Sequence, residues 1–399
     1  MLVLTQHFAP EVTAGRFRVE AFTDGLVARG HDVHVLCPVP NHPRGVIEEG
    51  YRRQLVSRRR VGGSRVTYLR VAVARHKTLR TRLAYYGSYA ALACAFGAFQ
   101  RRPDVVLASS PPLTVPAAGA LLAARYRVPL VLDIRDLWPD SALDLGELRP
   151  GAVASAAERL ERYVYRRAAA IATANDAFRA RIAERAPPAA RVEVVHNGTT
   201  RGWLEVGESV VERSSVGLPD GRFVWAYAGN IGLAHGLEFA ADAARLLGDD
   251  YRLLVIGEGP RRADLEARVA GQESSTVELR GLMSPHRAAL HLRAADAVLV
   301  SERQEATVSA KLYDVCAVGR PVVAACRGEL RRLVEREGIA LPVPHGDAEA
   351  LAQAVQRLRS DSELRQRLSE RARLFAQAHL REREAERLAE LLESVAVPR

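Results

Sequence analysis

The sequence predicts an α/β protein built from two doubly wound domains, each with a mainly parallel sheet. The chain opens with a short strand at residues 1–5, a loop containing Gly15, a helix at 18–29 and a second strand at 32–37. Strand, glycine loop, helix and strand in this order begin a doubly wound α/β unit. The same plan starts again at residues 223–228, and 399 residues are enough for two cores.

The remaining elements follow this alternation of short apolar strands and helices. In the first half we expect a helix at 158–167 and strands at 104–110, 128–132, 168–175 and 192–195. In the second half we expect helices at 237–247, 348–358 and 361–394, and strands at 252–256, 277–280, 294–300 and 322–325. A polar stretch at 201–221 separates the halves, which predicts domains at 1–200 and 201–375 with a terminal helix at 376–399.

Composition sets the broad class. Hydrophobic residues make up 48% and charged residues 26% of the chain, as in ordinary globular proteins. The four cysteines are scattered in apolar contexts without metal or disulfide spacing, which indicates a reducing compartment. Because no charged segment precedes an apolar one at the N-terminus, we expect no signal peptide.

The net charge of +10 is concentrated in one region, residues 52–99. Ten arginines and Lys77 lie between residues 52 and 82, where no acid occurs, and residues 83–99 carry no charge. A basic patch beside an apolar, aromatic helix is typical of binding to an anionic membrane surface. A core helix beside a solvated arginine face is the other interpretation. A nucleic-acid surface is less favoured, since no recognition motif is present.

Residues 305–324 form the stretch around which we expect the function to be organised. Ser309 is predicted to cap a helix, Gly319 to end it in a left-handed conformation, and Pro321 to precede a buried strand. The helix N-terminus and Lys311 would favour a phosphate, and Asp314 could accept hydrogen bonds from ribose hydroxyls. An ordinary surface helix is the competing interpretation.

A second candidate lies at residues 133–140, which follow a predicted strand. Three carboxylates, an arginine and a tryptophan occur there, at the end of the sheet where ligands bind in open α/β folds. We expect Asp133 and Asp136 to act on a ligand, so that their asparagine variants keep the melting temperature. The structural alternative is that both pair with Arg135 and nearby arginines.

Several of these motifs resemble family 4 of the retaining GT-B glycosyltransferases. The 305–324 stretch resembles the nucleotide-sugar signature of that family, with Asp314 at the second glutamate and Ala306 at the first, where Glu305 stands one position early. Residues 133–139, Asp-Ile-Arg-Asp-Leu-Trp-Pro, match a motif of the subgroup that builds bacterial surface polysaccharides. Residues 196–198, His-Asn-Gly, are similar to the Pro-Asn-Gly that ends the N-terminal domain in this family.

The resemblance implies a GT-B fold, with two Rossmann-like domains facing across a cleft and the last helix crossing back to the first domain. The first domain would bind the acceptor and the second the nucleotide sugar, which relatives most often carry as UDP. We therefore expect transfer of a UDP-linked, N-acetylated sugar, with retention of configuration, to a polyprenyl-diphosphate-linked saccharide. The protein would work on the cytoplasmic face of the cell membrane, without nucleic acid as a partner.

The resemblance also assigns roles to residues. Asp133, Arg135, Asp136 and Lys311 would be catalytic, with Arg135 or Arg16 adding charge near the leaving diphosphate. Asn230 and His235 stand where relatives carry arginine and lysine. The donor would contact Gly15, Gly229, Asn230, Gly232, His235, Gly257, Glu305, Thr307, Ser309, Ala310, Lys311, Leu312 and Asp314.

The chain contains no Asp-x-Asp motif, which in the other main glycosyltransferase fold binds a metal, so we expect neither metal nor cofactor. Two other functions stay open at this point. One is a sugar-nucleotide epimerase or hydrolase on the same fold, in which the Asp133–Asp136 loop transfers protons. The other is a non-catalytic membrane-associated scaffold, since Ala306, Asn230 and His235 depart from the family pattern.

Overall fold

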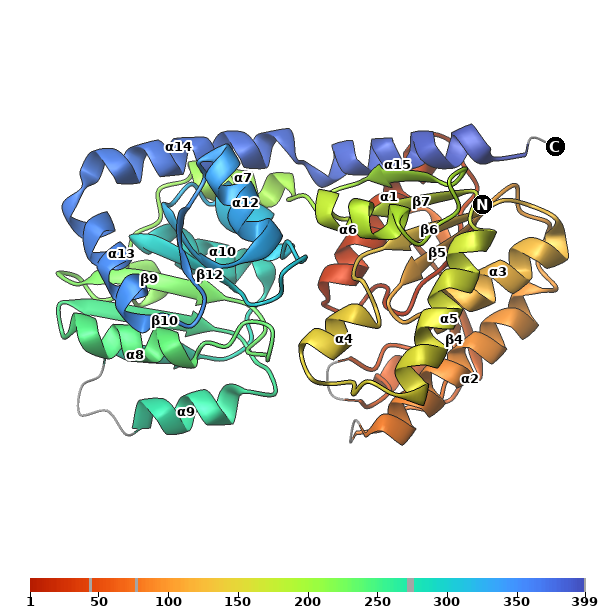
Figure 1. The fold of residues 1–399 in the computed structure, drawn as a ribbon, viewed down its shortest axis with the longest axis horizontal. Coiled ribbons are helices and arrows are strands. Elements are labelled where there is room, and N and C mark those ends of the chain that lie inside the picture. The colour runs from red at the N-terminus through yellow and green to blue at the C-terminus, as the bar shows by residue number, and fades with distance from the viewer. Residues whose placement is uncertain (43–44, 76–77, 271–275, 398–399) are drawn as a thin grey trace. The chain divides into compact units, whose positions relative to one another are not determined.

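The computed structural model describes residues 1–42, 45–75, 78–270 and 276–397, so Lys77 lies outside the described residues. The chain divides into two compact units, which are Met1–His196 with Arg381–Arg399, and Asn197–Leu380 (Figure 1). We predicted domain boundaries at residues 200 and 375, and the structure divides the chain after residues 196 and 380. Each unit has its own sheet and its own hydrophobic cores.

The first unit contains an eight-stranded sheet in the order β3-β4-β2-β1-β5-β6-β7-β8. Only β3 runs antiparallel to its neighbour, β4. Because helices cover both faces of a parallel sheet, its inner strands β1, β2, β5, β6 and β7 are buried along their whole length, whereas β3 and β8 at the two edges carry exposed residues. The strands are β1 (Leu2–Leu4), β2 (His34–Pro38), β3 (Val56–Val61), β4 (Ser64–Leu69), β5 (Val106–Ser110), β6 (Leu130–Ile134), β7 (Ala170–Thr173) and β8 (Arg191–Val194).

The helices of the first unit cover the two faces of this sheet. Side chains of α1 and α15, including Phe22 and Leu388, share one core with Leu107 of β5. Gly119 of α3 lies against Ala108, the next residue of β5, and therefore on the opposite face. The helices are α1 (Ala14–Ala28), α2 (Leu79–Gly97), α3 (Thr114–Tyr126), α4 (Asp140–Asp144), α5 (Ala152–Arg167), α6 (Asp176–Ala183) and α15 (Arg381–Val395), with a 3₁₀ turn η1 (Glu49–Tyr51).

The second unit contains a six-stranded, fully parallel sheet in the order β11-β10-β9-β12-β13-β14. Its strands are β9 (Phe223–Ala228), β10 (Tyr251–Ile256), β11 (Val277–Arg280), β12 (Ala297–Glu302), β13 (Val322–Cys326) and β14 (Leu341–Pro344). From β9 the sheet continues through β10 to β11 at one edge, and from β12 it continues through β13 to β14 at the other edge. These two adjacent strands therefore form the switch point, beside which doubly wound folds bind ligands.

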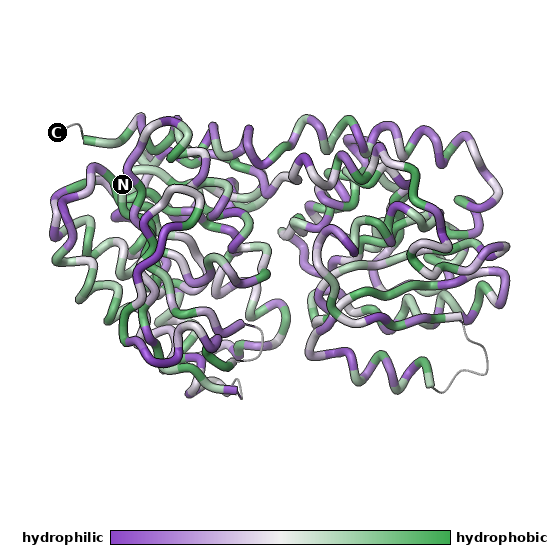
Figure 2. The backbone as a smooth tube through the Cα atoms, turned by 180° about the vertical axis from the view of Figure 1, so that it is seen from behind, coloured by the Kyte–Doolittle hydropathy of each residue, from purple (hydrophilic) through white to green (hydrophobic). Residues whose placement is uncertain are grey.

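Two cores sandwich the second sheet. One contains side chains of α7, α10, α11, α12 and α14, and the other contains side chains of α8, α9 and α13. Apolar strands run through the middle of each unit (Figure 2). The helices are α7 (Arg201–Glu208), α8 (Glu238–Leu247), α9 (Arg262–Ala270), α10 (Pro285–Ala294), α11 (Lys311–Ala317), α12 (Gly328–Glu337), α13 (Ala348–Ser360) and α14 (Ser362–Ala378), with a 3₁₀ turn η2 (Ser214–Val216).

Several element boundaries differ from the sequence prediction. Helix α1 begins at Ala14, four residues early, because Thr13 caps it by accepting the Arg16 N–H at 3.0 Å. The predicted helix at 361–394 is two helices, α14 and α15, which His379 and Leu380 separate. The hairpin of β3 and β4 was not predicted, since exposed arginines interrupt the apolar pattern of β3.

Helix α2 corresponds to the uncharged part of the region 52–99. Its side chains Tyr89 and Ala93 are fully buried, and the Tyr89 hydroxyl donates to the Leu36 carbonyl at 2.7 Å. Leu83 and Phe99, by contrast, are 58% and 90% exposed. Within the described part of the chain, no helix is both long and apolar enough to cross a membrane.

Candidate active site

Lys311, the first residue of α11, extends its side chain to the switch point of the second sheet. Its Nζ donates to the hydroxyl of Tyr227 at 2.5 Å and lies 4.4 Å from the centre of that ring. Tyr227 is a buried residue near the end of β9, and its hydroxyl donates to the Asn230 carbonyl at 2.7 Å. The ammonium is therefore fixed at the carboxyl ends of the strands, where an open α/β sheet binds ligands.

Two glycines make room for this lysine. A Cβ on Gly229 would lie 2.6 Å from both Cε and Nζ of Lys311, and a Cβ on Gly257 would lie 1.9 Å from the Gly229 carbonyl oxygen. Both glycines have positive φ values, +150° and +144°, which side chains rarely permit. The predicted sites Gly229 and Gly257 thus let the loop after β9 pack directly on Lys311 and on the loop after β10.

Burial decides the charge state of this amine. It lowers the pKa of Lys311 to about 7, although the carboxylate of Glu302 acts in the opposite direction. Glu302 ends β12 and is 2% exposed. At neutral pH the amine therefore exchanges easily between charged and neutral forms, and an anionic ligand would favour the ammonium.

His235 contributes no charge to this site. Its Nδ1 lies 2.9 Å from the Ser301 carbonyl oxygen, so Nδ1 carries the proton. Burial first, and then the neighbouring Lys311, lower the pKa of His235 to about 3, which keeps the ring neutral. Gly232 lies in the same loop, where a Cβ would come within 2.5 Å of the Asn230 amide.

The prediction that Ser309 caps α11 is wrong. The helix begins at Lys311 with Ala310 in the cap position, and no side chain makes a capping bond. Ser309 uses its carbonyl oxygen instead, which accepts the Leu312 N–H at 3.0 Å. The expected left-handed residue at the other end is confirmed, since Gly319 has a φ of +65°.

Other residues of the predicted donor site have structural partners. The Thr199 hydroxyl donates to Asp314 Oδ1 at 2.9 Å, and the proposed ribose contact of Asp314 stays a prediction. Glu305 is exposed and pairs with Arg327 at 3.2 Å. The Leu312 side chain is fully buried in the core, so it packs and does not face a ligand. Thr307 and Ala310 are half-buried.

In the first unit, Asp133 is a buried structural residue and belongs to β6, where a loop was expected. Its Oδ1 accepts two hydrogen bonds from the Arg18 guanidinium, at 3.0 and 2.9 Å, and its Oδ2 accepts one from Ser109 at 2.8 Å. Arg18 also donates to the His196 carbonyl at 2.7 Å. Asp133 is fully buried and joins α1, β5 and β6, which favours the structural alternative, and its catalytic role stays a prediction.

Arg135 lies over the N-terminal end of α1. A Cβ on Gly15 would lie 1.7 Å from its NH1 atom, while its NH2 donates to the Pro111 carbonyl at 3.0 Å. Within the described residues its buried Nε has no hydrogen-bond partner. Burial lowers the pKa of Arg135, but an arginine side chain stays protonated. The guanidinium and the helix N-terminus together favour an anion at this point.

Asp136 differs from Asp133. Its Oδ2 accepts the Ser141 hydroxyl at 2.9 Å, and among the described residues nothing donates to its Oδ1. Burial raises its pKa. This Oδ1 atom is itself buried, and the catalytic role of Asp136 stays a prediction.

Sequence reasoning missed Tyr227, Glu302 and Arg18. Tyr227 and Arg18 give no local signal, because each acts through a partner far away in the sequence, Lys311 or Asp133. Glu302 could have been found as an acid that directly follows an apolar strand, at the edge of the sheet where ligands bind.

The comparisons with known proteins agree with this architecture. A model described as "Glycosyl transferase 4-like domain" matches residues 14–198, and one described as "Glycosyl transferases group 1" matches residues 222–361. WcaI of Escherichia coli (strain K12), whose name refers to a colanic acid biosynthesis glycosyl transferase, is 27% identical over 372 residues, which are 89% of this chain and 91% of WcaI. The alpha-D-kanosaminyltransferase of Streptomyces kanamyceticus is 28% identical over 53% of this chain and 56% of its own length.

Solved structures show the same fold. Sucrose-phosphate synthase from Thermosynechococcus elongatus has a TM-score of 0.74 at 18% identity and covers 98% of both chains. Anabaena HepE in complex with UDP-glucose has a TM-score of 0.73 at 16% identity and covers 98% of this chain and 99% of its own. The two open, mostly parallel sheets and their switch points thus define a GT-B architecture.

With both domain models matched in the expected order, the chain belongs to the GT-B glycosyltransferases of family 4. Besides WcaI, it is similar to the glycosyltransferase WbjE of Pseudomonas aeruginosa, which is 22% identical over 65% of this chain and 66% of its own length.

Proposed function

We propose that this protein transfers a sugar from a UDP-linked donor to a polyprenyl-diphosphate-linked saccharide, with retention of configuration. The reaction would be a step in the synthesis of a cell-surface polysaccharide, on the cytoplasmic face of the membrane. An N-acetylated sugar is the first donor to test. Since the sequence has no Asp-x-Asp motif, we further propose that the reaction proceeds without a metal, and EDTA should leave turnover unchanged.

The observation that carries this proposal is the position of Lys311. Its ammonium lies on Tyr227 and beside Gly229, at the switch point of the second sheet. A diphosphate is dianionic or more highly charged as a leaving group, so a buried cation there would stabilise the transition state more than the ground state. HepE supports the choice of nucleotide, since its structures were solved in complex with UDP and with UDP-glucose.

Two observations support a membrane-bound acceptor. The name of WcaI refers to colanic acid, a polysaccharide, and the matched stretch spans most of both chains. In the first unit, the edge strand β3 exposes Arg58, Arg59 and Arg60 in a row, and α2 exposes Leu83. Exposed arginines and an exposed apolar residue on the same unit suit an anionic lipid surface.

The test is a screen of UDP-linked sugars by thermal shift, followed by a transfer assay. A donor at a hundred times its Kd should stabilise the protein by about 2.7 kcal/mol. The best donor is then mixed with polyprenyl-diphosphate-linked N-acetylglucosamine, and the anomeric configuration of the product is determined by NMR. If no nucleotide sugar stabilises the protein, the proposed donor is wrong. If the product has inverted configuration, the proposed retention is wrong.

A further inference from the structure

A buried carboxylate, Glu302, lies at the switch point of the second sheet. It is the last residue of β12 and is 2% exposed. Side chains alternate along a strand, so Glu302 lies on the same face of the sheet as Val298 and Val300. These two valines share a core with Leu312 of α11. Glu302 therefore lies on the face that α11 covers, and the first residue of that helix is Lys311.

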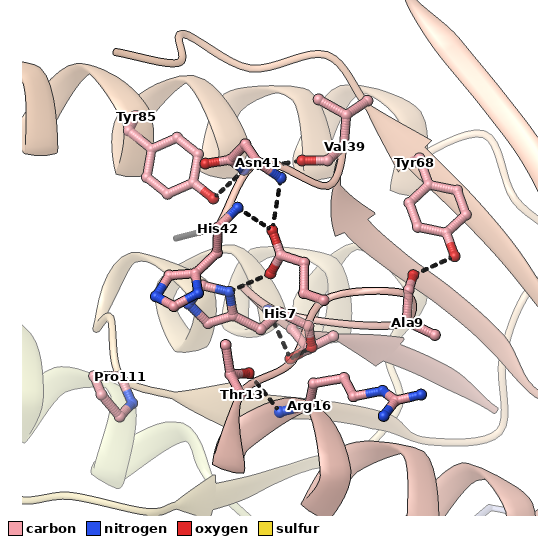
Figure 3. A network of polar contacts seen from close by, with 12 residues as sticks. His7, Ala9, Thr13, Arg16, Val39, Asn41, His42, Tyr68, Tyr85 and Pro111 are labelled. Carbon is pink, nitrogen blue, oxygen red and sulfur yellow. Dashed lines mark hydrogen bonds and ion pairs between the residues drawn. The ribbon is translucent and has the colours of Figure 1, made fainter. Parts of the chain in front are cut away.

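Other buried acids in the chain show what such a carboxylate requires. In the first unit, Glu11 Oε2 lies 2.5 Å from His7 Nδ1. Its Oε1 accepts the backbone N–H groups of Asn41 and His42 (Figure 3). A charge that is taken out of water is costly unless it is paired. Buried acids with an arginine partner within 3.1 Å are Asp133, Glu161, Glu329 and Glu384, which pair with Arg18, Arg185, Arg332 and Arg387. We therefore expect a basic partner for Glu302 as well.

Titratable side chains face Glu302 from the strands, the loop and the helix around it. They are Tyr227 of β9, His235 of the loop after β9, Cys326 of β13 and Lys311 of α11. His235 Nδ1 lies 4.0 Å from Glu302 Oε2. Cys326 is the partner of Glu302 in the register of β12 and β13. The charge on Glu302 therefore acts on groups from four separate elements.

Of these four groups, Lys311 is the one that can supply a positive charge at neutral pH. Burial, and then the carboxylate of Glu302, raise the pKa of Tyr227 far above its usual value, so the phenol is neutral. Burial raises the pKa of Cys326 to about 12 and lowers that of His235 to about 3, so both are uncharged. Burial also lowers the pKa of Lys311 to about 7, and the carboxylate of Glu302 opposes that fall. Within this group, Lys311 is therefore the counter-ion of Glu302.

We propose that Glu302 is a positioning residue for the transfer: its carboxylate keeps the Lys311 amine in the ammonium form and so prepares the site for the donor diphosphate. This inference rests on the proposed function, in which Lys311 stabilises that diphosphate. The Tyr227 hydroxyl fixes the position of the Lys311 Nζ atom, and Glu302 sets its charge. Without Glu302, burial would act on Lys311 unopposed, and the amine would be mostly neutral at pH 7.

The test is a direct titration of Lys311. The sequence contains two lysines, Lys77 and Lys311, so lysine labelled with ¹³C at Cε gives two NMR signals, and Lys77→Arg assigns them. In the wild-type protein the Lys311 signal should titrate near pH 7, which is its pKa. In Glu302→Gln the midpoint should fall by about one pH unit or more, the usual effect of removing a nearby opposite charge. Glu302→Asp holds its charge one methylene further back, so its midpoint should lie between those of the wild type and Glu302→Gln.

The matched control is Glu329→Gln. This variant removes a carboxylate of the same unit that is 8% exposed and pairs with Arg332 at 2.8 Å. The Lys311 midpoint should keep its wild-type value in the control. If Glu302→Gln does not fold, Glu302→Asp carries the test, because a retreat of the charge must lower the midpoint. An unchanged midpoint in Glu302→Asp would then overturn the inference.

Calorimetry with UDP connects this titration to the donor site. A carboxylate also repels a diphosphate, so at a pH below both midpoints Glu302→Gln should bind UDP at least as tightly as the wild type does. Above both midpoints its affinity should be lower, by about tenfold for each pH unit between the two midpoints. A merely structural role of Glu302 would weaken UDP binding equally at every pH.

The outcomes separate this inference from the proposed function. If the Lys311 midpoint is the same in Glu302→Gln as in the wild type, or the UDP affinity of the variant falls equally at every pH, the inference is wrong. The proposed function then stands as long as the wild type binds UDP. A wild-type protein that binds neither UDP nor any nucleotide sugar would overturn both. A lower midpoint, together with UDP affinities that cross as the pH rises, supports the inference.

Discussion

The Nζ atom of Lys311 donates a hydrogen bond of 2.5 Å to the hydroxyl of Tyr227 and lies over the face of the same ring. The pair joins the first residue of α11 to the end of β9, two segments 84 positions apart in the sequence. The tyrosine hydroxyl can donate onward to Asn230, so the ammonium is held by an oriented acceptor and by the ring face together. A cation fixed in this way loses little freedom when a diphosphate binds.

The first prediction concerns the contribution of Lys311 to catalysis. Charge develops on the diphosphate as the glycosidic bond breaks, so Lys311→Ala should lower kcat by about a hundredfold or more, like the loss of other transition-state donors.

Asp314→Asn should mainly raise the donor KM, since the ribose does not change during the reaction. Lys311→Arg is the sharper variant, because a planar guanidinium does not fit the space between Gly229 and Tyr227. Steady-state measurements of kcat and donor KM for these three variants test the predictions. Full activity of Lys311→Arg would show that a positive charge at this position is sufficient for catalysis.

The second prediction is a pH dependence that Lys311 causes. Folding lowers its pKa from 10.5 to about 7, so between these values the unfolded chain binds more protons than the folded chain. The contribution of this group to stability should therefore rise as the pH increases from 7 toward 10.5. Lys311→Met should remove that rise, which urea unfolding at a series of pH values would detect. An unchanged pH profile in this variant would contradict the lowered pKa.

Donor binding should show the opposite sign. Above pH 7 the free protein holds Lys311 mostly neutral, and a diphosphate would favour the ammonium, so binding should take up a proton and weaken as the pH rises. Calorimetry in buffers of different ionisation enthalpy measures this uptake directly. The Lys311→Met variant is the control and should show none.

Much of this architecture could be predicted from the sequence because it depends on local patterns. The predicted bounds of β9 and β11 agree with the structure to the residue, since apolar strands and turn residues mark their ends clearly. Gly319 was predicted as left-handed from its position between a helix and Pro321, and the structure agrees. A glycine at the end of a helix, followed within two residues by a proline, is a strong local signal.

The partners of the charged residues could not be predicted in the same way. The motif at 133–139 gave no reason to distinguish Asp133 from Asp136. Asp133 is paired with Arg18, whereas the buried Oδ1 of Asp136 has no hydrogen-bond partner among the described residues. The end of β6 was predicted two residues too early, so Asp133, which belongs to the strand, was expected in the same loop as Asp136, which follows it. Tyr227 likewise acquires its significance from Lys311, a partner 84 positions away that only the fold brings near.

The third prediction follows from the ion pair of Asp133 and Arg18. Asp133→Asn would leave a buried guanidinium with part of its partner missing, so the free energy of unfolding should fall by about 3–5 kcal/mol. Asp136→Asn should cost little stability, because that carboxylate has one side-chain partner. Urea unfolding of both variants checks the contrast. The double variant Arg18→Met with Asp133→Leu should recover part of the loss, and if it does not, the ion pair is not the cause.

The fourth prediction concerns the membrane. Reversal of Arg58, Arg59 and Arg60 to glutamate should release the protein from vesicles that contain anionic lipid, since each arginine near such a surface contributes about 1 kcal/mol. The control reverses three arginines of α12 in the second unit, Arg331, Arg332 and Arg336, and changes the net charge equally. Co-sedimentation at low and high salt is the measurement. Equal binding of both variants, or binding that salt does not weaken, would contradict a surface site on β3.

The last prediction concerns Gly15 and Arg135. A methyl group at position 15 would occupy the place of the Arg135 NH1 atom, 1.7 Å away, so Gly15→Ala must move the guanidinium off the N-terminus of α1. Within the helix, alanine is favoured over glycine by about 1 kcal/mol, and the guanidinium is the movable end of a long side chain, so stability should change little. If an anion of the substrate binds there, kcat/KM should fall in Gly15→Ala nearly as far as in Arg135→Ala. Gly87→Ala is the matched control, because this helical glycine of α2 has open space around its Cβ position and should keep full activity. Normal kinetics in Gly15→Ala, with the melting temperature unchanged, would show that Arg135 does not act from its position over Gly15.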